Sequence, residues 1–377
     1  MKHSVAFQII SIALMAFQSF LSPVILGLED FGDQILLIIP VLLTQSLVEP
    51  AFQMQVNKSL SNGMLSINLF SIVLTAFLGL GFLCAVLFVT GSIDALVLIA
   101  FFISYILYTL NIAIFFAVDK IGYAAISIGI FMTFYVFTFF AALALLDGKE
   151  ILLGNLVGSL TATLFGVATI MRKIAPQFER KLSFAHVSFN SLSYRLPVVA
   201  FSNATTILLG VVGAAAGTVG EFRIFLAAIN ASRYFNLVPL AELQSAIEVG
   251  IGSRKFVHLR VVARRFLLSF ACFAVGMTFV FPPIYDVVFG DRNFGRMALL
   301  ISMLFVLVQP LSYMVSDSRH AKPISIAIAN AAIALLMLAV FWTSIQFTAD
   351  PYVAMGRSVA ITLCCYAIMA LNYTRGA

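Results

Sequence analysis

Long uncharged apolar runs, separated by short charged segments, fill this chain from end to end. A helix needs about 20 apolar residues to cross the hydrocarbon core of a bilayer. The runs therefore predict twelve membrane-spanning helices. These span residues 5–28, 34–54, a stretch within 59–93, 94–119, 121–146, 151–171, 196–220, 222–245, 266–289, 297–316, 323–348 and 356–374.

The charge and proline positions also predict three local features. Glu221 is expected to mark the outer turn between the seventh and eighth spans. The polar segment 147–150 is expected to form an outer loop before the sixth span. Two consecutive prolines, Pro282 and Pro283, are expected to break the ninth helix, because proline removes a backbone hydrogen bond.

A basic connector, residues 172–195, divides the twelve runs into six and six. It contains five Arg or Lys residues and a single acid, Glu179. The fold class predicted is thus an all-α polytopic membrane protein with about twelve transmembrane helices in two six-helix bundles, residues 1–171 and 196–377.

The charge pattern predicts an orientation, because basic residues favour the cytoplasmic ends of spans. With both termini inside, the cytoplasmic segments carry about three times as many Lys and Arg residues as the outer segments, to which Arg223 is assigned. Arg233 then remains as the basic residue inside a span. The N and C termini are therefore predicted to be cytoplasmic.

Composition excludes several other classes of protein. Hydrophobic residues make up 62% of the chain and charged residues 10%, whereas about a quarter of the residues in soluble domains are charged. The net charge of +6 is spread over short segments without a basic face, so no nucleic-acid partner is expected. No metal-ligand, phosphate-loop or nucleophile motif occurs, so we expect no metal, no cofactor and no enzyme activity.

The second and eighth spans share a pattern that suggests a repeated six-helix unit. Each has an acid followed by Phe at its entry, and a Pro with a nearby Glu further along. The matching pairs are Phe31 with Phe222, Pro50 with Pro239 and Glu49 with Glu242. Duplicated halves with a site between them recur among transporters.

These stretches carry a family resemblance. GLEDFG followed by LLTQSLVEPAF in the second span, and VGEFRIFLAAINASRYFNLVPLAE in the eighth, resemble the bacterial polysaccharide (O-antigen type) flippases of the multidrug/oligosaccharidyl-lipid/polysaccharide exporter superfamily. The resemblance implies two bundles that open a cationic cavity alternately to each face of the bacterial inner membrane. It implies outward movement of an undecaprenyl-diphosphate-linked oligosaccharide. The partners implied are this lipid-linked substrate, membrane lipids, a glycan polymerase and a chain-length regulator.

Arg233 is the first candidate for substrate binding. It lies twelve residues past Glu221, which is roughly 18 Å along a helix and near the middle of the hydrocarbon. An Arg there costs about 2.5 to 3.5 kcal/mol on insertion scales, so such residues usually face a cavity or a partner. The guanidinium fork matches a phosphate, while the alternative is a structural ion pair with Glu49 or Glu242.

The other candidates are polar residues inside spans. Glu49 and Glu242 lie near the cytoplasmic ends of the second and eighth spans, where they either bind the coupling ion or lie at the membrane interface. Four further residues either bind the sugar or hydrogen-bond between helices. These are Asn203, Asn230, Tyr234 and Gln45.

Two alternative functions remain open on sequence alone. A drug or cation antiporter of the same superfamily should display acids rather than a base in its cavity. A membrane-embedded glycan polymerase should have a long polar outer loop, whereas the longest polar segment here is the cytoplasmic connector.

Overall fold

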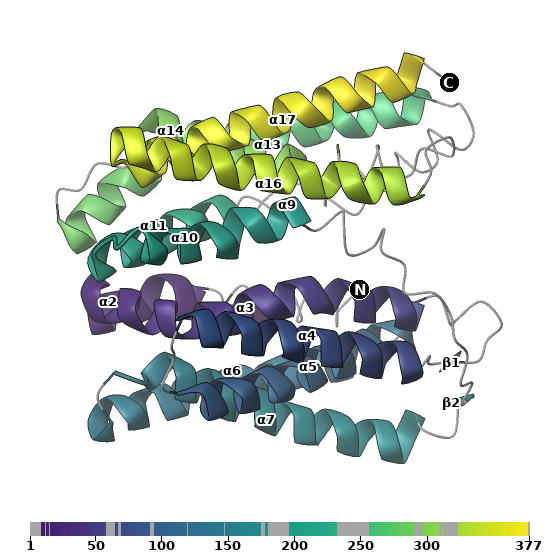
Figure 1. Ribbon diagram of the computed structural model, residues 1–377. Helices are drawn as coiled ribbons and strands as arrows, with labels where there is room; N and C mark the ends of the chain where they lie inside the picture. Colours follow the sequence, from purple (N-terminus) through teal and green to yellow (C-terminus); the bar gives the residue numbers. More distant parts are fainter. Residues whose placement is uncertain are drawn as a thin grey trace. The chain divides into compact units, whose positions relative to one another are not determined.

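The computed structural model describes residues 9–57, 65–66, 69–90, 94–174, 178–179, 196–231, 256–290, 296–311 and 323–375, apart from positions 12, 15, 119, 147, 309 and 310. The chain forms two compact units, shown in Figure 1. Unit 1 comprises Met1–Arg195 and Ala215–Gly220, and unit 2 comprises Leu196–Ala214 and Glu221–Ala377.

Unit 1 consists of long apolar helices. Its N-terminal helix ends in a π-helical turn and one short helix, and the left-handed backbone of Gly27, with φ of +86°, stops it there. The elements in chain order are η1 (Phe17–Leu21), α2 (Ser22–Leu26), α3 (Leu28–Asn57), α4 (Leu69–Thr90), α5 (Ala95–Ala117), α6 (Ile121–Leu145), α7 (Glu150–Thr169) and η3 (Ile170–Ile174).

Glycine allows α6 and α7 to lie directly against each other, as Figure 1 shows. A Cβ atom at Gly158 would stand 2.9 Å from the backbone oxygen of Phe131, and one at Gly154 would stand 3.0 Å from the ring of Tyr135. Inside a bilayer the hydrophobic effect does not drive helices together. Membrane helices therefore associate through close backbone packing of this kind. Phe131, Tyr135 and Phe139 stack along the facing side of α6.

Two loop segments of unit 1 also pair. β1 (Leu65–Ser66) and β2 (Phe178–Glu179) form a two-residue parallel pairing, with Leu65 opposite Phe178. This pairing joins the segment after α3 to the basic connector, and it is a small departure from the predicted all-α class. The described part of the connector consists of η3 through Ile174 and β2.

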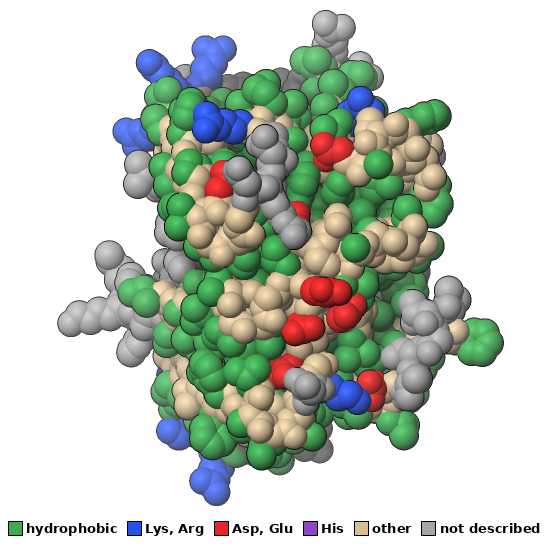
Figure 2. Space-filling model, turned by 90° about the vertical axis from the view of Figure 1, so that its left-hand side faces the viewer, with side chains coloured by type: hydrophobic (Ala, Val, Ile, Leu, Met, Phe, Trp, Pro, Cys, Tyr) green, Lys and Arg blue, Asp and Glu red, His purple; other side chains and the backbone are tan. Residues whose placement is uncertain are grey.

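The charges of unit 1 separate between its two ends. The starts of α3, α5 and α7 lie at one end, because Lys149 pairs with Asp94 at 2.8 Å and Gln34 binds Glu150. Figure 2 views the molecule from the left of Figure 1 and shows Asp and Glu side chains on that face. At the opposite end, Lys173 donates to the Tyr123 hydroxyl at 2.8 Å and lies 5.0 Å from its ring centroid.

Unit 2 begins with a continuous helical run that contains a π-helical turn. This run consists of α9 (Leu196–Val199), η5 (Ala200–Ala204) and α10 (Thr205–Val211). The remaining elements are α11 (Ala216–Ala231), whose residues from Glu221 onward belong to unit 2, α13 (Phe256–Phe289), α14 (Arg296–Met303), η6 (Leu304–Leu307), α16 (Pro323–Thr348) and α17 (Pro351–Arg375).

The predicted turn at Glu221 is wrong. The seventh helical run ends at Val211, and Gly213, with φ of +79°, turns the chain so that α11 begins at Ala216. The amide of Ala214 donates to the Leu209 oxygen at 3.1 Å, which is the hydrogen bond of a glycine-terminated helix. Glu221 and Arg223 consequently lie inside α11, and the assignment of Arg223 to an outer segment is also wrong.

Three further expectations are corrected. α13 continues through Pro282 and Pro283 to Phe289, because a membrane helix tolerates freed backbone groups that neighbouring groups can satisfy. Glu150 is not in a loop but is the first residue of α7, and its side chain is 1% exposed. α17 begins at Pro351, five residues before the expected start.

The described residues thus form an all-helical membrane protein apart from the two-residue strand pairing. Each of the twelve predicted spans contains helix within the described residues. Seven of the described helices are long and apolar enough to cross a membrane. They are Leu28–Val48, Ala95–Phe116, Ile121–Leu145, Glu150–Ile174, Arg260–Phe289, Ser325–Thr348 and Pro351–Leu371.

Candidate functional site

Arg223 is a basic residue held inside a helix of unit 2. Its half-buried side chain comes from the second turn of α11, between the fully buried residues Phe222 and Ile224. One guanidinium nitrogen, Nη1, donates to the backbone oxygen of Ser202 at 3.0 Å and to Oδ1 of Asn203 at 3.2 Å. A guanidinium therefore lies among neutral oxygens within an apolar helix pair.

The π-helical turn η5 makes this arrangement possible. A π turn displaces the backbone by one residue, and such turns are frequent at functional sites. The Ser202 oxygen accepts from Arg223 and also from Thr206 Oγ1 at 3.0 Å. The Thr205 hydroxyl satisfies the neighbouring Phe201 oxygen at 2.6 Å. This turn thus supplies one backbone and one side-chain acceptor to Arg223, and neither is a carboxylate.

Within the described part of the chain, Arg223 makes no ion pair, and its Nε and Nη2 groups donate to no residue. A buried charge is costly unless it is paired and hydrogen-bonded. The remaining donors have the fork geometry that binds two oxygens of a phosphate or carboxylate. This site can therefore accept an anion.

The same helix carries a buried acid on its other side. Glu221 is two residues before Arg223, which places it about 200° around the helix axis. Its Oε2 accepts a hydrogen bond from the Tyr352 hydroxyl at 3.0 Å, and its side chain is 7% exposed. Glu221 thus joins α11 to the start of α17 and does not neutralise Arg223.

A second polar cluster lies within unit 1, at the starts of α3 and α7. Gln34 bridges the two helices: Nε2 donates to Glu150 Oε2, and Oε1 accepts from the Ile151 amide at 2.8 Å. Gln18 then donates to Asn155 Oδ1 at 3.1 Å, and Asn155 donates to the Ile151 oxygen at 2.8 Å. These polar groups are satisfied by one another, so the cluster ties helices together.

The structure brings some of the predicted site residues together. Asn203 lies in η5, is 4% exposed and binds Arg223. Asn230 lies seven residues beyond Arg223 in α11, on the same face and about 10 Å further along the axis. Gln45 lies in α3 of unit 1, where it is 8% exposed.

Other predicted residues lie beyond the described part of the chain. Arg233, Tyr234 and Glu242 lie outside the described residues. Glu49 is in α3, but its side chain is likewise outside the description. Sequence reasoning missed Arg223 and the Gln34–Glu150 pair as buried groups. The glycine at position 213 was the available signal for the turn that moves Arg223 into a helix.

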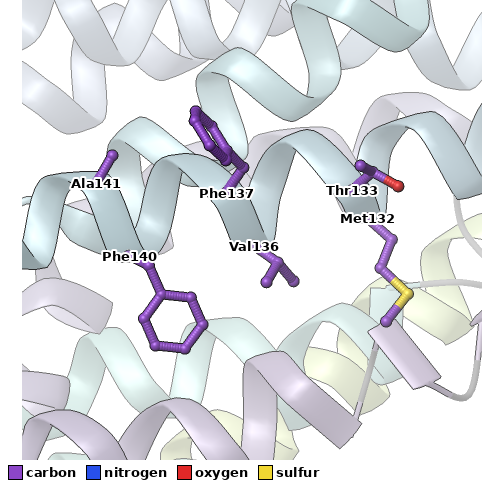
Figure 3. Close-up of a pocket in the computed structure, with 6 residues that line it drawn as sticks. All are labelled: Met132, Thr133, Val136, Phe137, Phe140 and Ala141. Carbon is purple, nitrogen blue, oxygen red and sulfur yellow. The ribbon is translucent and has the colours of Figure 1, made fainter.

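A hollow of about 620 Å³ lies on the surface of α6 in unit 1. Figure 3 shows its lining side chains on successive turns of this one helix. The single hydroxyl among them, that of Thr133, donates to the Gly129 oxygen of its own helix at 2.8 Å. The described residues that line the hollow include no charged group, which suits a surface that faces lipid. Its lining residues are Met132, Thr133, Val136, Phe137, Phe140 and Ala141.

Comparison with solved structures establishes the fold. The chain is similar to an inward-facing multidrug resistance MATE family transporter of the MOP superfamily, with a TM-score of 0.63 and 10% identity over 99% of this chain and 94% of that one. The chain shares the fold of this transporter over almost its whole length. It is also similar to the Vibrio cholerae MATE transporter VcmN in the bent form, with a TM-score of 0.55 and 13% identity over 99% of this chain and 96% of that one.

At these identities the similarity establishes the fold alone. No protein-family profile matches the sequence, and no curated protein sequence does. The similarity agrees with the predicted all-α polytopic architecture, and the shared fold covers 99% of this chain.

Proposed function

We propose that this protein is an alternating-access flippase that moves a polyprenyl-diphosphate-linked oligosaccharide from the cytoplasmic to the outer leaflet of a bacterial inner membrane. The observation that carries the proposal is Arg223, a half-buried cation inside α11 whose described partners are neutral oxygens. A diphosphate supplies the negative charge that such a guanidinium lacks. A cationic drug would be repelled by it.

Two nearby groups extend this assignment. Asn203 orients the guanidinium. Asn230, on the same face of α11 and about two turns beyond Arg223, is placed to bind sugar hydroxyls. Arg233 and Tyr234 follow in the sequence, and we assign them to the same substrate path. Gln45 is assigned to sugar binding in unit 1, and Glu49 and Glu242 to the coupling ion.

An antiporter of cationic drugs is the second candidate. Both solved structures of similar fold are MATE transporters, one of them a multidrug resistance protein. The buried acids Glu150 and Glu221 are groups that a cation could use. Both already accept hydrogen bonds from neutral side chains, from Gln34 and Tyr352 respectively, which favours a structural role over drug binding.

The test is transport by the purified protein in vesicles. A fluorescent polyprenyl-diphosphate oligosaccharide should become accessible to a membrane-impermeant quencher on the opposite leaflet, whereas a cationic dye should not accumulate under a proton or sodium gradient. Arg233→Ala should lose lipid movement and Arg233→Lys should retain part of it, since lysine keeps the charge without the fork. Gradient-driven dye uptake without lipid movement would favour the antiporter.

The proposed direction of transport requires the cytoplasmic placement of the basic segments. In unit 1, Arg172 and Lys173 lie at the end opposite to Asp94, which supports this placement. Reporter fusions after Lys58, within 176–190 and after Arg260 should read cytoplasmic. Fusions at Asp147 and Asp291 should read periplasmic. A periplasmic reading for the connector would reverse the orientation proposed for both units.

A further inference from the structure

From Arg260 to Ile284, α13 carries a row of exposed residues spaced four apart. The row winds gradually around the helix, because each step of four residues adds a net rotation of about 40°. Buried residues recur every fourth position on this helix, from Val262 through Phe266 and Phe270 to Ala274 and Thr278. A position two residues from a buried one lies about 200° around the axis, so it is on the opposite side. All such positions from the first turns to the last are exposed. They are Arg260, Arg264, Leu268, Cys272, Gly276, Val280 and Ile284.

The charged end of this row has no protein partner in the described structure. Arg260, Arg264 and the adjacent Arg265 are exposed, and they make no hydrogen bond or ion pair with any described residue. Other basic residues near helix ends do find partners: Lys149 pairs with Asp94, and Arg296 lies 5.8 Å from the ring of Phe279. The side chains of the arginines near the start of α13 are therefore available to bind groups outside the described protein.

The position of these arginines matches the headgroup layer of a bilayer. Twenty-five residues separate Arg264 from the last residue of α13, Phe289, which is about 38 Å of helix. This exceeds the hydrocarbon thickness of about 30 Å and is just below the thickness that includes the headgroups, about 40–45 Å. Arg260 and Arg264 thus lie where lipid phosphates lie when Phe289 is at the other interface.

The apolar part of the row leaves room for an acyl chain beside the helix. Leu268 is followed one turn later by the small side chain of Cys272 and then by Gly276, where an added Cβ would meet no atom within 4 Å. Val280 and Ile284 continue the path, with exposed fractions of 54% and 56%. A shallow apolar track thus winds around the helix from the two arginines.

We propose that this winding row of α13, the stripe from Arg260 to Ile284, binds an anionic phospholipid of the surrounding leaflet. The phosphate lies against Arg260 and Arg264, whose guanidinium forks can each bind two phosphate oxygens. One acyl chain follows Leu268, Cys272 and Gly276 along the helix. The described residues of the stripe include no acid, so no carboxylate there repels the phosphate. This binding is separate from the transport proposed for α11.

Cys272 provides a direct probe of the lipid at this stripe, because it is exposed and lies eight residues, about 12 Å, beyond Arg264. Replacing Cys84, Cys364 and Cys365 with serine leaves it as the single cysteine for a fluorescent label. Two sets of phosphatidylcholine vesicles are then made. One contains a fraction of brominated phosphatidylglycerol, and the other contains the same fraction of brominated phosphatidylcholine. Brominated phosphatidylglycerol should quench the label more strongly, with a preference of about fivefold per arginine at low salt.

The matched variants separate this site from general charge effects. Arg260→Gln with Arg264→Gln should reduce the preference to near equality. Arg357→Gln should leave it unchanged. Arg357 is also exposed, but it lies beside Gly356, which packs near Ala298 in the first turns of α14, at the other end of unit 2. Transport activity should survive in all three single-cysteine proteins, so failure here is distinguishable from failure of the proposed function.

Three results would overturn the proposal. Equal quenching by the two brominated lipids at low salt would mean that the stripe has no preference for an anionic headgroup. A preference that persists in the double arginine variant would place the anionic lipid elsewhere. Displacement of brominated phosphatidylglycerol by stoichiometric polyprenyl phosphate would identify the stripe as a substrate entry site rather than a phospholipid site.

Discussion

Replacing Arg223 with methionine is expected to reduce transport of a polyprenyl-diphosphate oligosaccharide by at least tenfold, while the protein becomes more stable. Methionine keeps the length of the side chain and removes a charge whose described partners are neutral oxygens. Replacing buried ionic groups with apolar ones of similar volume is often neutral or stabilising, by about 1 to 4 kcal/mol. A structural role for Arg223 predicts the opposite sign for stability.

The protein should still fold after Arg223→Met, because the Ser202 oxygen that loses Arg223 as a donor keeps another one. The Ser202 oxygen still accepts from Thr206 Oγ1 at 3.0 Å, so it is not left unsatisfied. Arg223→Lys should retain part of the transport, because the positive charge remains without the fork. Arg357→Met is the matched control: it makes the same exchange at an exposed position of α17 and should change neither property.

The measurement pairs vesicle transport with thermal unfolding of the detergent-solubilised protein. Lost transport with an equal or higher unfolding temperature assigns Arg223 to the substrate. Unchanged transport in Arg223→Met would contradict this assignment and would leave Arg233 as the remaining candidate. A lower unfolding temperature would show that the bonds to Ser202 and Asn203 stabilise unit 2.

The helical spans could be predicted from sequence because the bilayer sets a minimum apolar length. Charged residues bound most of these spans, so α5, α6 and α16 begin within about two residues of their expected positions. The turn before α11 could not be found by charge, because it lies in an uncharged run. It is made by the backbone of Gly213, and a turn signal rather than a charge signal marks it.

The errors at the candidate sites have the same origin. Counting Glu221 as the turn moved Arg223 out of the membrane and left Arg233 as the cation inside a span. Glu150 follows Gly148 and Lys149, so the sequence pattern predicts a loop at this position. Its partner Gln34 is 116 residues away, and no local pattern connects them. Long-range side-chain pairs of this kind depend on how helices pack, which periodicity does not specify.

The interface of α6 and α7 yields the prediction with the largest effect on stability. Gly158→Val is expected to destabilise unit 1 by at least about 3 kcal/mol, at the upper end of overpacking costs. The Cβ of any residue there would stand 2.9 Å from the Phe131 oxygen and 3.4 Å from the Tyr135 nitrogen. Both are backbone atoms of α6, so neither can rotate away. The two helices must separate, and their stacked contacts weaken together.

Gly129→Val is the control at a glycine of the same helix pair. A Cβ at Gly129 meets only the end of the Ile10 side chain, at 4.0 Å, so this variant should change stability by less than about 1 kcal/mol. The readout is the unfolding temperature of each variant in one detergent, followed by size-exclusion chromatography. Equal unfolding temperatures for Gly158→Val and Gly129→Val would contradict the close contact of α6 and α7. A Gly158→Ala variant should lie between the two, because it adds the clashing Cβ without the branches.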